Sequence, residues 1–128
     1  MDNLFIAATA TSPEVDFRFG ENLLSLSGES YPENAAAFYA PVIERLRVYL
    51  ANCADVVVTV NVTLIYFNSS STKILFGIFD ALDQAASSGN RVLVNWFRDE
   101  EDETIREFGE ELRTDFTAIK FTDCPVAT

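Results

Sequence analysis

One segment constrains the fold more than any other. The run DVVVTVNVTLIYF, Asp55–Phe67, is dense in β-branched and aromatic residues. Its even-numbered positions from Val56 to Leu64 are all apolar, whereas its odd-numbered positions mix apolar side chains with threonine and asparagine. An alternation with period two is typical of a β-strand. Because one face is wholly apolar and the other partly so, we expect an inner strand with helices nearby.

Three further segments have the spacing of amphipathic helices. The first begins near Asn34, which can cap it, and contains Pro41, so we expect a distortion at that proline. The second follows the serines after Phe67 and ends near Gly89. The third starts in an acidic run that suits the positive end of a helix dipole. The expected inward stripes are Ile43, Leu46 and Leu50; Ile74, Leu75, Ile78, Phe79 and Leu82; and Ile105, Phe108 and Leu112.

Shorter segments predict the remaining strands. Val15–Phe19 and Leu24–Ser27 alternate around a Gly-Glu-Asn turn, which favours a hairpin. Arg91–Phe97 and Phe116–Phe121 predict two later strands, the second of them the last in the chain. We also expect Phe5-Ile6 to add a short strand before the hairpin.

Without that short strand, the element order is β-β-α-β-α-β-α-β in a single domain over residues 1–128. Repeated strand–helix–strand crossovers predict an α/β fold with a mixed, mostly parallel sheet and helices packed on it. The loops that leave parallel strands gather at the carboxyl edge of the sheet. We therefore expect Tyr31, Glu33, Asn34, Ser69 and Arg98 to lie together at that edge.

Composition excludes several classes of function. The formal charge is −11, from 20 acidic and 9 basic residues, which disfavours nucleic-acid backbones and anionic membranes as partners. The chain has no histidine, and Cys53 and Cys124 are far apart, so we expect no metal site and no cofactor. We find neither a signal peptide nor an apolar window long enough to span a membrane, and so expect a cytoplasmic protein.

Four hydroxyl residues, Ser69 to Thr72, stand between the long strand and the second helix, followed by Lys73. A serine N-cap, at Ser69 or Ser70, would stabilise the helix by about 1 kcal/mol but would not require the other hydroxyls. The spacing from Ser70 to Lys73 also matches the S-x-x-K motif of penicillin-binding enzymes. Its companion motifs S-D-N and K-T-G are absent, and a histidine-based triad is impossible, so we expect no catalytic residue.

Two further interpretations involve negative charge at this helix N-terminus. It could bind an anion or nucleotide, but no phosphate-binding glycine motif occurs in the sequence. Alternatively, a serine there could be phosphorylated, which would add a charge of about −1.5 to −2 beside the positive end of the helix. The helix dipole and the exposed amides would then hold the phosphate without melting the helix.

The element order, with serines opening the helix after the central strand, resembles the STAS domains of anti-sigma-factor antagonists. In those domains, a serine at this place is phosphorylated by a partner-switching kinase. Two stretches look closer to the SiaC-type bacterial regulatory phosphoproteins: GESYPEN (28–34) and YFNSSSTK (66–73). VNWFRDEEDE and FGEELRTDF are weaker similarities, so that the resemblance covers nearly the whole chain.

The resemblance implies a non-enzymatic, partner-switching regulator in c-di-GMP and biofilm signalling. Its partners would be a Ser/Thr kinase of the histidine-kinase-like ATPase type, a PP2C-like phosphatase, and a diguanylate cyclase that the unphosphorylated form binds and activates. Two alternatives stay open. The chain could be an anti-sigma-factor antagonist that binds a kinase or an anti-sigma factor, or a small-ligand-binding domain that uses the same loop edge.

The resemblance also assigns residues. The acceptor hydroxyl follows the asparagine of the Y-x-N stretch, which makes Ser69 the expected phosphorylation site and Ser70 its rival. The residues around it would form a partner-binding surface, called here the recognition rim: Tyr31, Glu33, Asn34, Asn68, Ser70 and Lys73.

Overall fold

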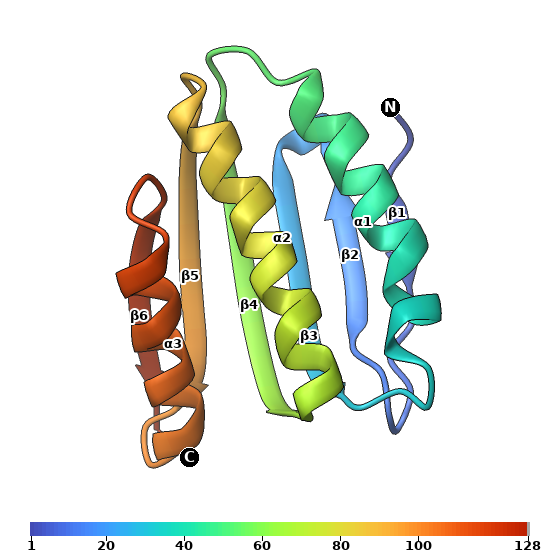
Figure 1. Ribbon diagram of the computed structural model, residues 1–128, viewed down its shortest axis with the longest axis vertical. Helices are drawn as coiled ribbons and strands as arrows, with labels where there is room; N and C mark the ends of the chain where they lie inside the picture. Colours follow the sequence, from blue (N-terminus) through green and yellow to red (C-terminus); the bar gives the residue numbers. More distant parts are fainter. Residues whose placement is uncertain (128) are drawn as a thin grey trace.

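The strands of the sheet lie side by side in the order in which they occur along the chain (Figure 1). The computed structural model describes residues 1–127. Its strands are β1 (Leu4–Ile6), β2 (Glu14–Arg18), β3 (Leu23–Ser30), β4 (Val57–Phe67), β5 (Arg91–Asp99) and β6 (Lys120–Val126). Its helices are α1 (Ala35–Ala51), α2 (Ser69–Ser87) and α3 (Glu103–Asp115), with a 3₁₀ turn at Phe19–Glu21.

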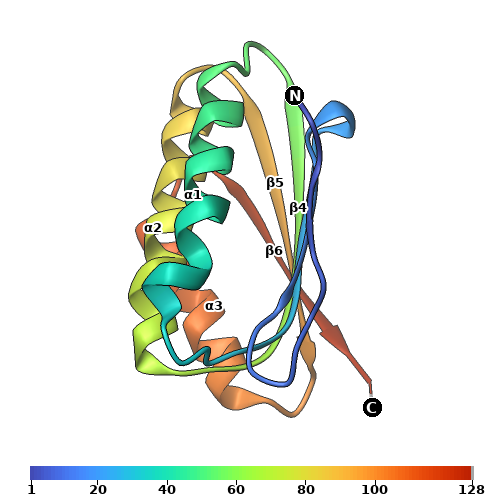
Figure 2. The ribbon, with the colours of Figure 1, turned by 90° about the vertical axis from the view of Figure 1, so that its right-hand side faces the viewer.

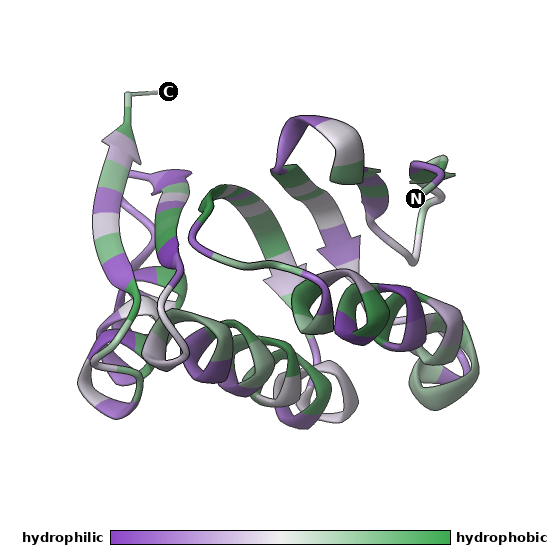
Figure 3. Cartoon of the chain, turned by 90° about the horizontal axis from the view of Figure 1, so that it is seen from above, coloured by the Kyte–Doolittle hydropathy of each residue, from purple (hydrophilic) through white to green (hydrophobic). Residues whose placement is uncertain are grey.

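The winding of the chain explains why the helices cover one face of the sheet. Strands β1, β2 and β3 pair antiparallel, whereas β3 to β6 pair parallel through the crossover helices. Each crossover moves to the next strand in the same direction, and crossovers are right-handed, so all three helices fall on the same side. Figures 2 and 3 show these helices on one face and the opposite face uncovered. The predicted α/β domain with a mixed, mostly parallel sheet is confirmed.

The core lies between the helices and the covered face. The even-numbered residues of β4 from Val58 to Leu64 are buried there, while the odd-numbered ones are partly or fully exposed, as the alternation predicted. The predicted helix stripes also face the core, with Ile43 and Ile74 half-buried. Their fully buried members are Leu46, Leu50, Leu75, Ile78, Phe79, Leu82, Ile105, Phe108 and Leu112.

A bulge interrupts the pairing of β3 and β4 close to the carboxyl edge. Gly28 pairs with Leu64, but the next residue of β3 pairs with Tyr66, which leaves Ile65 as an extra residue. Gly28 has a φ of +119°, a conformation that only glycine adopts easily. Bulges re-aim side chains, and here both Ile65 and Tyr66 are exposed.

The N-terminal half follows the sequence-based expectations closely. β1 confirms the short strand expected at Phe5-Ile6, so the chain begins with three strands. The side chain of Asn34 accepts a 3.0 Å hydrogen bond from the amide of Ala37 and caps α1, as predicted. Helix α1 then continues through Pro41 as one element.

The last strand differs from the prediction. We expected it at Phe116–Phe121, but β6 begins at Lys120 and pairs with β5 as far as Val126. Pairing with β5 therefore decides where this strand forms, and the segment before it only connects α3 to the sheet. Pro125 is tolerated because β6 is an edge strand, where one side of the backbone needs no partner.

Candidate functional site at the carboxyl edge of the sheet

Three loops meet at the carboxyl edge, as the parallel order predicted. The loops that lead into α1, α2 and α3 all leave the same end of the sheet (Figure 1). The amide of Asn68 donates a 3.1 Å hydrogen bond to the carbonyl oxygen of Ser30, which ties the first two loops together. The rings of Tyr31 and Tyr66 also pack edge to face across these loops, with centroids 5.5 Å apart.

Asn68, not a serine, caps α2. Its side-chain oxygen accepts a 3.1 Å hydrogen bond from the amide of Ser71, and its carbonyl oxygen accepts from the Thr72 amide and hydroxyl. The expectation of a cap at Ser69 or Ser70 is therefore wrong. Asparagine caps helices as well as serine does, and here it comes first after the strand.

Ser69 and Ser70 occupy the first two positions of the helix, and both are exposed. Within residues 1–127, neither side chain makes a hydrogen bond. The amides at these two positions cannot find a partner inside the helix, and they carry the positive end of its dipole. Two hydroxyl groups therefore stand in solvent beside a positive helix end.

Ser71, by contrast, lies in a buried network of three hydroxyl groups that sequence reasoning missed. Ser30 Oγ donates to Ser71 Oγ at 2.9 Å and lies 2.6 Å from the hydroxyl of Tyr39. All three side chains have 0 % exposure. Since Ser30 has one proton and gives it to Ser71, the Tyr39 hydroxyl must be the donor to Ser30.

The ionisation of Tyr39 fits this assignment. Burial raises the pKa of its phenol. The phenol therefore stays protonated and remains available as a donor.

The structure brings part of the expected recognition rim together. Tyr31 is about one-third exposed and Lys73 and Glu33 are exposed, while Asn34 and Asn68 each use a side-chain oxygen as a helix cap. Asn68 contacts Ser30 through its backbone amide, and the ring of Tyr31 contacts that of Tyr66. Tyr66 was not among the predicted residues, because only the bulge turns it outward.

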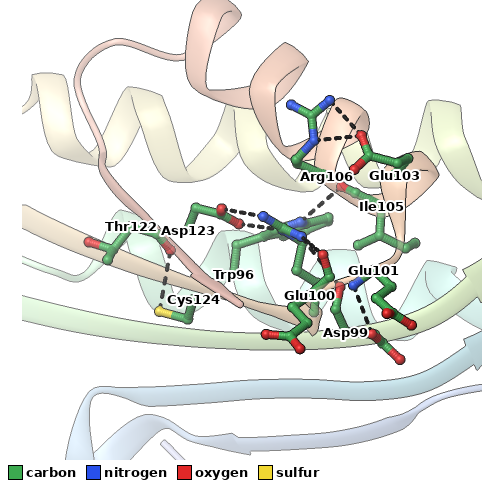
Figure 4. A network of polar contacts seen from close by, with 11 residues as sticks. Trp96, Asp99, Glu100, Glu101, Glu103, Ile105, Arg106, Thr122, Asp123 and Cys124 are labelled. Carbon is green, nitrogen blue, oxygen red and sulfur yellow. Dashed lines mark hydrogen bonds and ion pairs between the residues drawn. The ribbon is translucent and has the colours of Figure 1, made fainter. Parts of the chain in front are cut away.

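Arg98 lies at the edge as expected but is not free to bind a partner. Its side chain is 7 % exposed and forms two 2.9 Å contacts with the carboxylate of Asp123. It also donates to the carbonyl oxygens of Asp99 and Glu100. Figure 4 shows the carboxylate of Asp123 near Asp99 and Glu100. Through these contacts the Arg98 side chain joins β6 to the loop before α3.

The edge offers little room for a small ligand. A hollow of about 210 Å³ lies between the end of β4 and the start of α3, smaller than the roughly 300 Å³ at which ligand pockets usually begin. It is lined by Ile65, Tyr66, Phe67, Asp102, Thr104 and Ile105. In open α/β sheets, ligands bind where the winding direction reverses, and this sheet has no such reversal.

In residues 1–127, no group of three or more His, Cys, Asp or Glu side chains could hold a metal ion. None of the helices described is long and apolar enough to cross a bilayer.

Within the part of the chain that the structure describes, the fold and this edge define a class of protein: a single α/β domain with a mixed six-stranded sheet, three helices and exposed hydroxyl groups at the start of its second helix. The sequence model of the SiaC family of regulatory phosphoproteins matches residues 6–126, and the chain belongs to that family. An uncharacterised protein of Pseudomonas aeruginosa strain UCBPP-PA14 is 32% identical over 115 residues, which cover 90% of each chain.

Solved structures agree with this assignment. The crystal structure of apo-SiaC from Pseudomonas aeruginosa has a TM-score of 0.88 at 30% identity, covering 97% of this chain and 99% of that one. SiaC of the same organism, in a crystal structure with the diguanylate cyclase SiaD that it activates, also scores 0.88 at 30% identity. That alignment covers 98% of this chain and 99% of the other.

Proposed function

We propose that this chain is a partner-switching regulator whose binding state is set by a phosphate on Ser69. One observation carries the proposal: Ser69 is exposed at the first position of α2, beside backbone amides that have no partner inside the helix. The neighbouring Ser71 is buried, so the fold itself separates a hydroxyl that a kinase can reach from one that it cannot.

The switching step is a phosphoryl transfer from ATP. A bond forms between Ser69 Oγ and the γ-phosphorus as the bond from that phosphorus to the β,γ-bridging oxygen breaks. ADP leaves with the electron pair, and a base of the kinase takes the serine proton. Hydrolysis by the phosphatase returns the hydroxyl and releases inorganic phosphate. The helix end tolerates the added charge, so the surface changes while the fold does not.

Membership of the family supports a proposal for the partners. We expect the unphosphorylated form to bind and activate a diguanylate cyclase in the cytoplasm, as SiaC of Pseudomonas aeruginosa activates SiaD. A Ser/Thr kinase of the histidine-kinase-like ATPase type would add the phosphate, and a PP2C-like phosphatase would remove it. The recognition rim defined above would contact these partners, and the chain itself would catalyse no reaction.

The experiment is an affinity purification with mass spectrometry from the bacterium that carries the gene, combined with phosphopeptide mapping. We expect a diguanylate cyclase, the kinase or the phosphatase to co-purify, and the phosphate to lie on Ser69. Recovery of an anti-sigma factor instead of a cyclase would favour the antagonist alternative. Phosphate found only outside Ser69–Thr72 would contradict the switch.

A further inference from the structure

The buried hydroxyl network joins three elements at the start of α2. Ser30 ends β3, Tyr39 lies on the second turn of α1, and Ser71 lies on the first turn of α2. The backbone of Asn68 is held to Ser30 as well. The first turn of α2 is therefore fixed both along its axis and in rotation about it.

This rotation decides which hydroxyl faces solvent. An α-helix turns by about 100° per residue, so Ser69 stands about 160° around the axis from Ser71, and Ser70 about 100°. With Ser71 held inward, Ser69 points most directly away from the protein. A rotation by one residue would instead bring Ser70 inward and turn Thr72 outward.

We propose that Ser30, Tyr39 and Ser71 are positioning residues of the phosphorylation site. Their network holds α2 in the one rotation that presents Ser69 and withholds Ser71 and Thr72 from the kinase. This inference rests on the proposed function and adds a selection rule to it. A buried network, and not only the kinase, excludes Ser71 and Thr72 and leaves the two exposed hydroxyl groups, of which Ser69 points more directly outward.

The chain offers a matched control for the contribution of Tyr39. Tyr49 is a second buried tyrosine of α1, and its hydroxyl donates a 2.6 Å hydrogen bond to Asn22 Oδ1, away from α2. Tyr39→Phe and Tyr49→Phe remove the same group from the same helix. A change that only destabilises the domain affects both variants alike, whereas a positioning role affects Tyr39→Phe alone.

In the test, the chromosomal copy of the gene carries one substitution at a time: Tyr39→Phe, Ser71→Ala or Tyr49→Phe. The cell's own kinase then acts on each variant. Phosphopeptide mass spectrometry then measures the share of phosphate at each hydroxyl. We expect Tyr39→Phe and Ser71→Ala to raise the share on Thr72 about fivefold, as for the loss of one hydrogen bond. Tyr49→Phe should match the wild type.

Each other outcome has a defined meaning. If the wild type carries its phosphate on Ser69 and the variants show the same distribution, the positioning role is overturned but the switch is not. Equal shifts in Tyr39→Phe and Tyr49→Phe would lead to the same conclusion. Wild-type phosphate mainly on Ser70 would also overturn the positioning role. Absence of phosphate from Ser69–Thr72 would overturn the switch, and the inference with it. Amide hydrogen exchange at Ser71 and Thr72, whose amides are bonded to Asn68, gives a kinase-free check: it should accelerate in Tyr39→Phe and not in Tyr49→Phe.

Discussion

The ring of Tyr31 meets the ring of Tyr66 at an interplanar angle of 72°, and both side chains remain partly in solvent. Aromatic side chains of this kind dominate the energetics of many protein interfaces. This pair stands where the first two loops of the carboxyl edge are tied together, and Tyr31 belongs to the expected recognition rim.

We therefore expect Tyr31→Ala to weaken binding of the effector about tenfold without unfolding the domain. The measurement is a titration of the purified effector, with circular dichroism to check the fold. Val57→Ala is a suitable control, because Val57 is 48% exposed but stands at the opposite end of β4. Equal losses in the two variants would argue against a role for the edge.

Replacing Ser69 by aspartate should mimic part of the phosphate charge. We expect Ser69→Asp to keep the fold, with a melting temperature equal to or slightly above the wild type, because an acidic residue in the first turn suits the dipole. Pull-down of the effector should fall. Ser87→Asp places the same charge at the other end of α2 and should bind normally. Unchanged pull-down by Ser69→Asp would count against the switch.

The cap at Asn68 predicts a change in stability. Asn68→Ala should lower the free energy of unfolding by about 1 kcal/mol, because the amide of Ser71 loses its acceptor. Asn68→Asp retains an oxygen at the same place and should restore most of the loss. Urea denaturation of the unphosphorylated protein measures both, and an unaffected alanine variant would show that water replaces the cap.

Two helix glycines predict opposite effects of the same substitution. A Cβ on Gly109 would lie 2.8 Å from Trp96 Nε1, which is fixed by a hydrogen bond to the Ile105 carbonyl oxygen. Gly109→Ala should therefore destabilise the domain by about 1–3 kcal/mol. A Cβ on Gly77 meets nothing within 4 Å, and Gly77→Ala should stabilise α2 by about 1 kcal/mol. Denaturant unfolding should show a lower free energy of unfolding for Gly109→Ala and a higher one for Gly77→Ala.

Alkaline pH should destabilise the protein through its buried tyrosines. Burial raises the pKa of Tyr39, and burial together with the neighbouring Cys53 thiol raises that of Tyr49. Unfolded tyrosines ionise near pH 10, so the unfolded state loses protons first. Stability that is complete below about pH 10 is then lost as the pH rises towards the folded values. Urea unfolding between pH 8 and pH 11 should show this decline, and Tyr39→Phe should make it shallower.

The sequence predicts most of the fold because its main elements have clear periodicity. Alternation locates β4, and the helical stripes locate α1, α2 and α3, since these patterns depend only on neighbouring residues. The features that the sequence did not predict depend on contacts between residues that are far apart in the chain. The position of β6 is set by its pairing with β5, and its proline and aspartate, which are uncommon in strands, obscure the strand pattern in the sequence.

The same limit applies to the candidate site. Parallel strand order is enough to gather the three loops at one edge. The buried Ser71 has its hydrogen-bond partner, Ser30, 41 residues away, whereas Ser69 is exposed. The side chain of Arg98 is likewise bound by Asp123, which lies 25 residues away in the chain. No local pattern contains these partners.

The one-directional winding of the sheet has a consequence for synthesis on the ribosome. Every strand pairs only with strands that are its neighbours in sequence, so no strand must wait for a distant one to emerge. The antiparallel strands β1 to β3 can form first, and each later strand then adds to an existing edge together with its helix. The nascent chain can thus fold from its N-terminus onward, in step with translation.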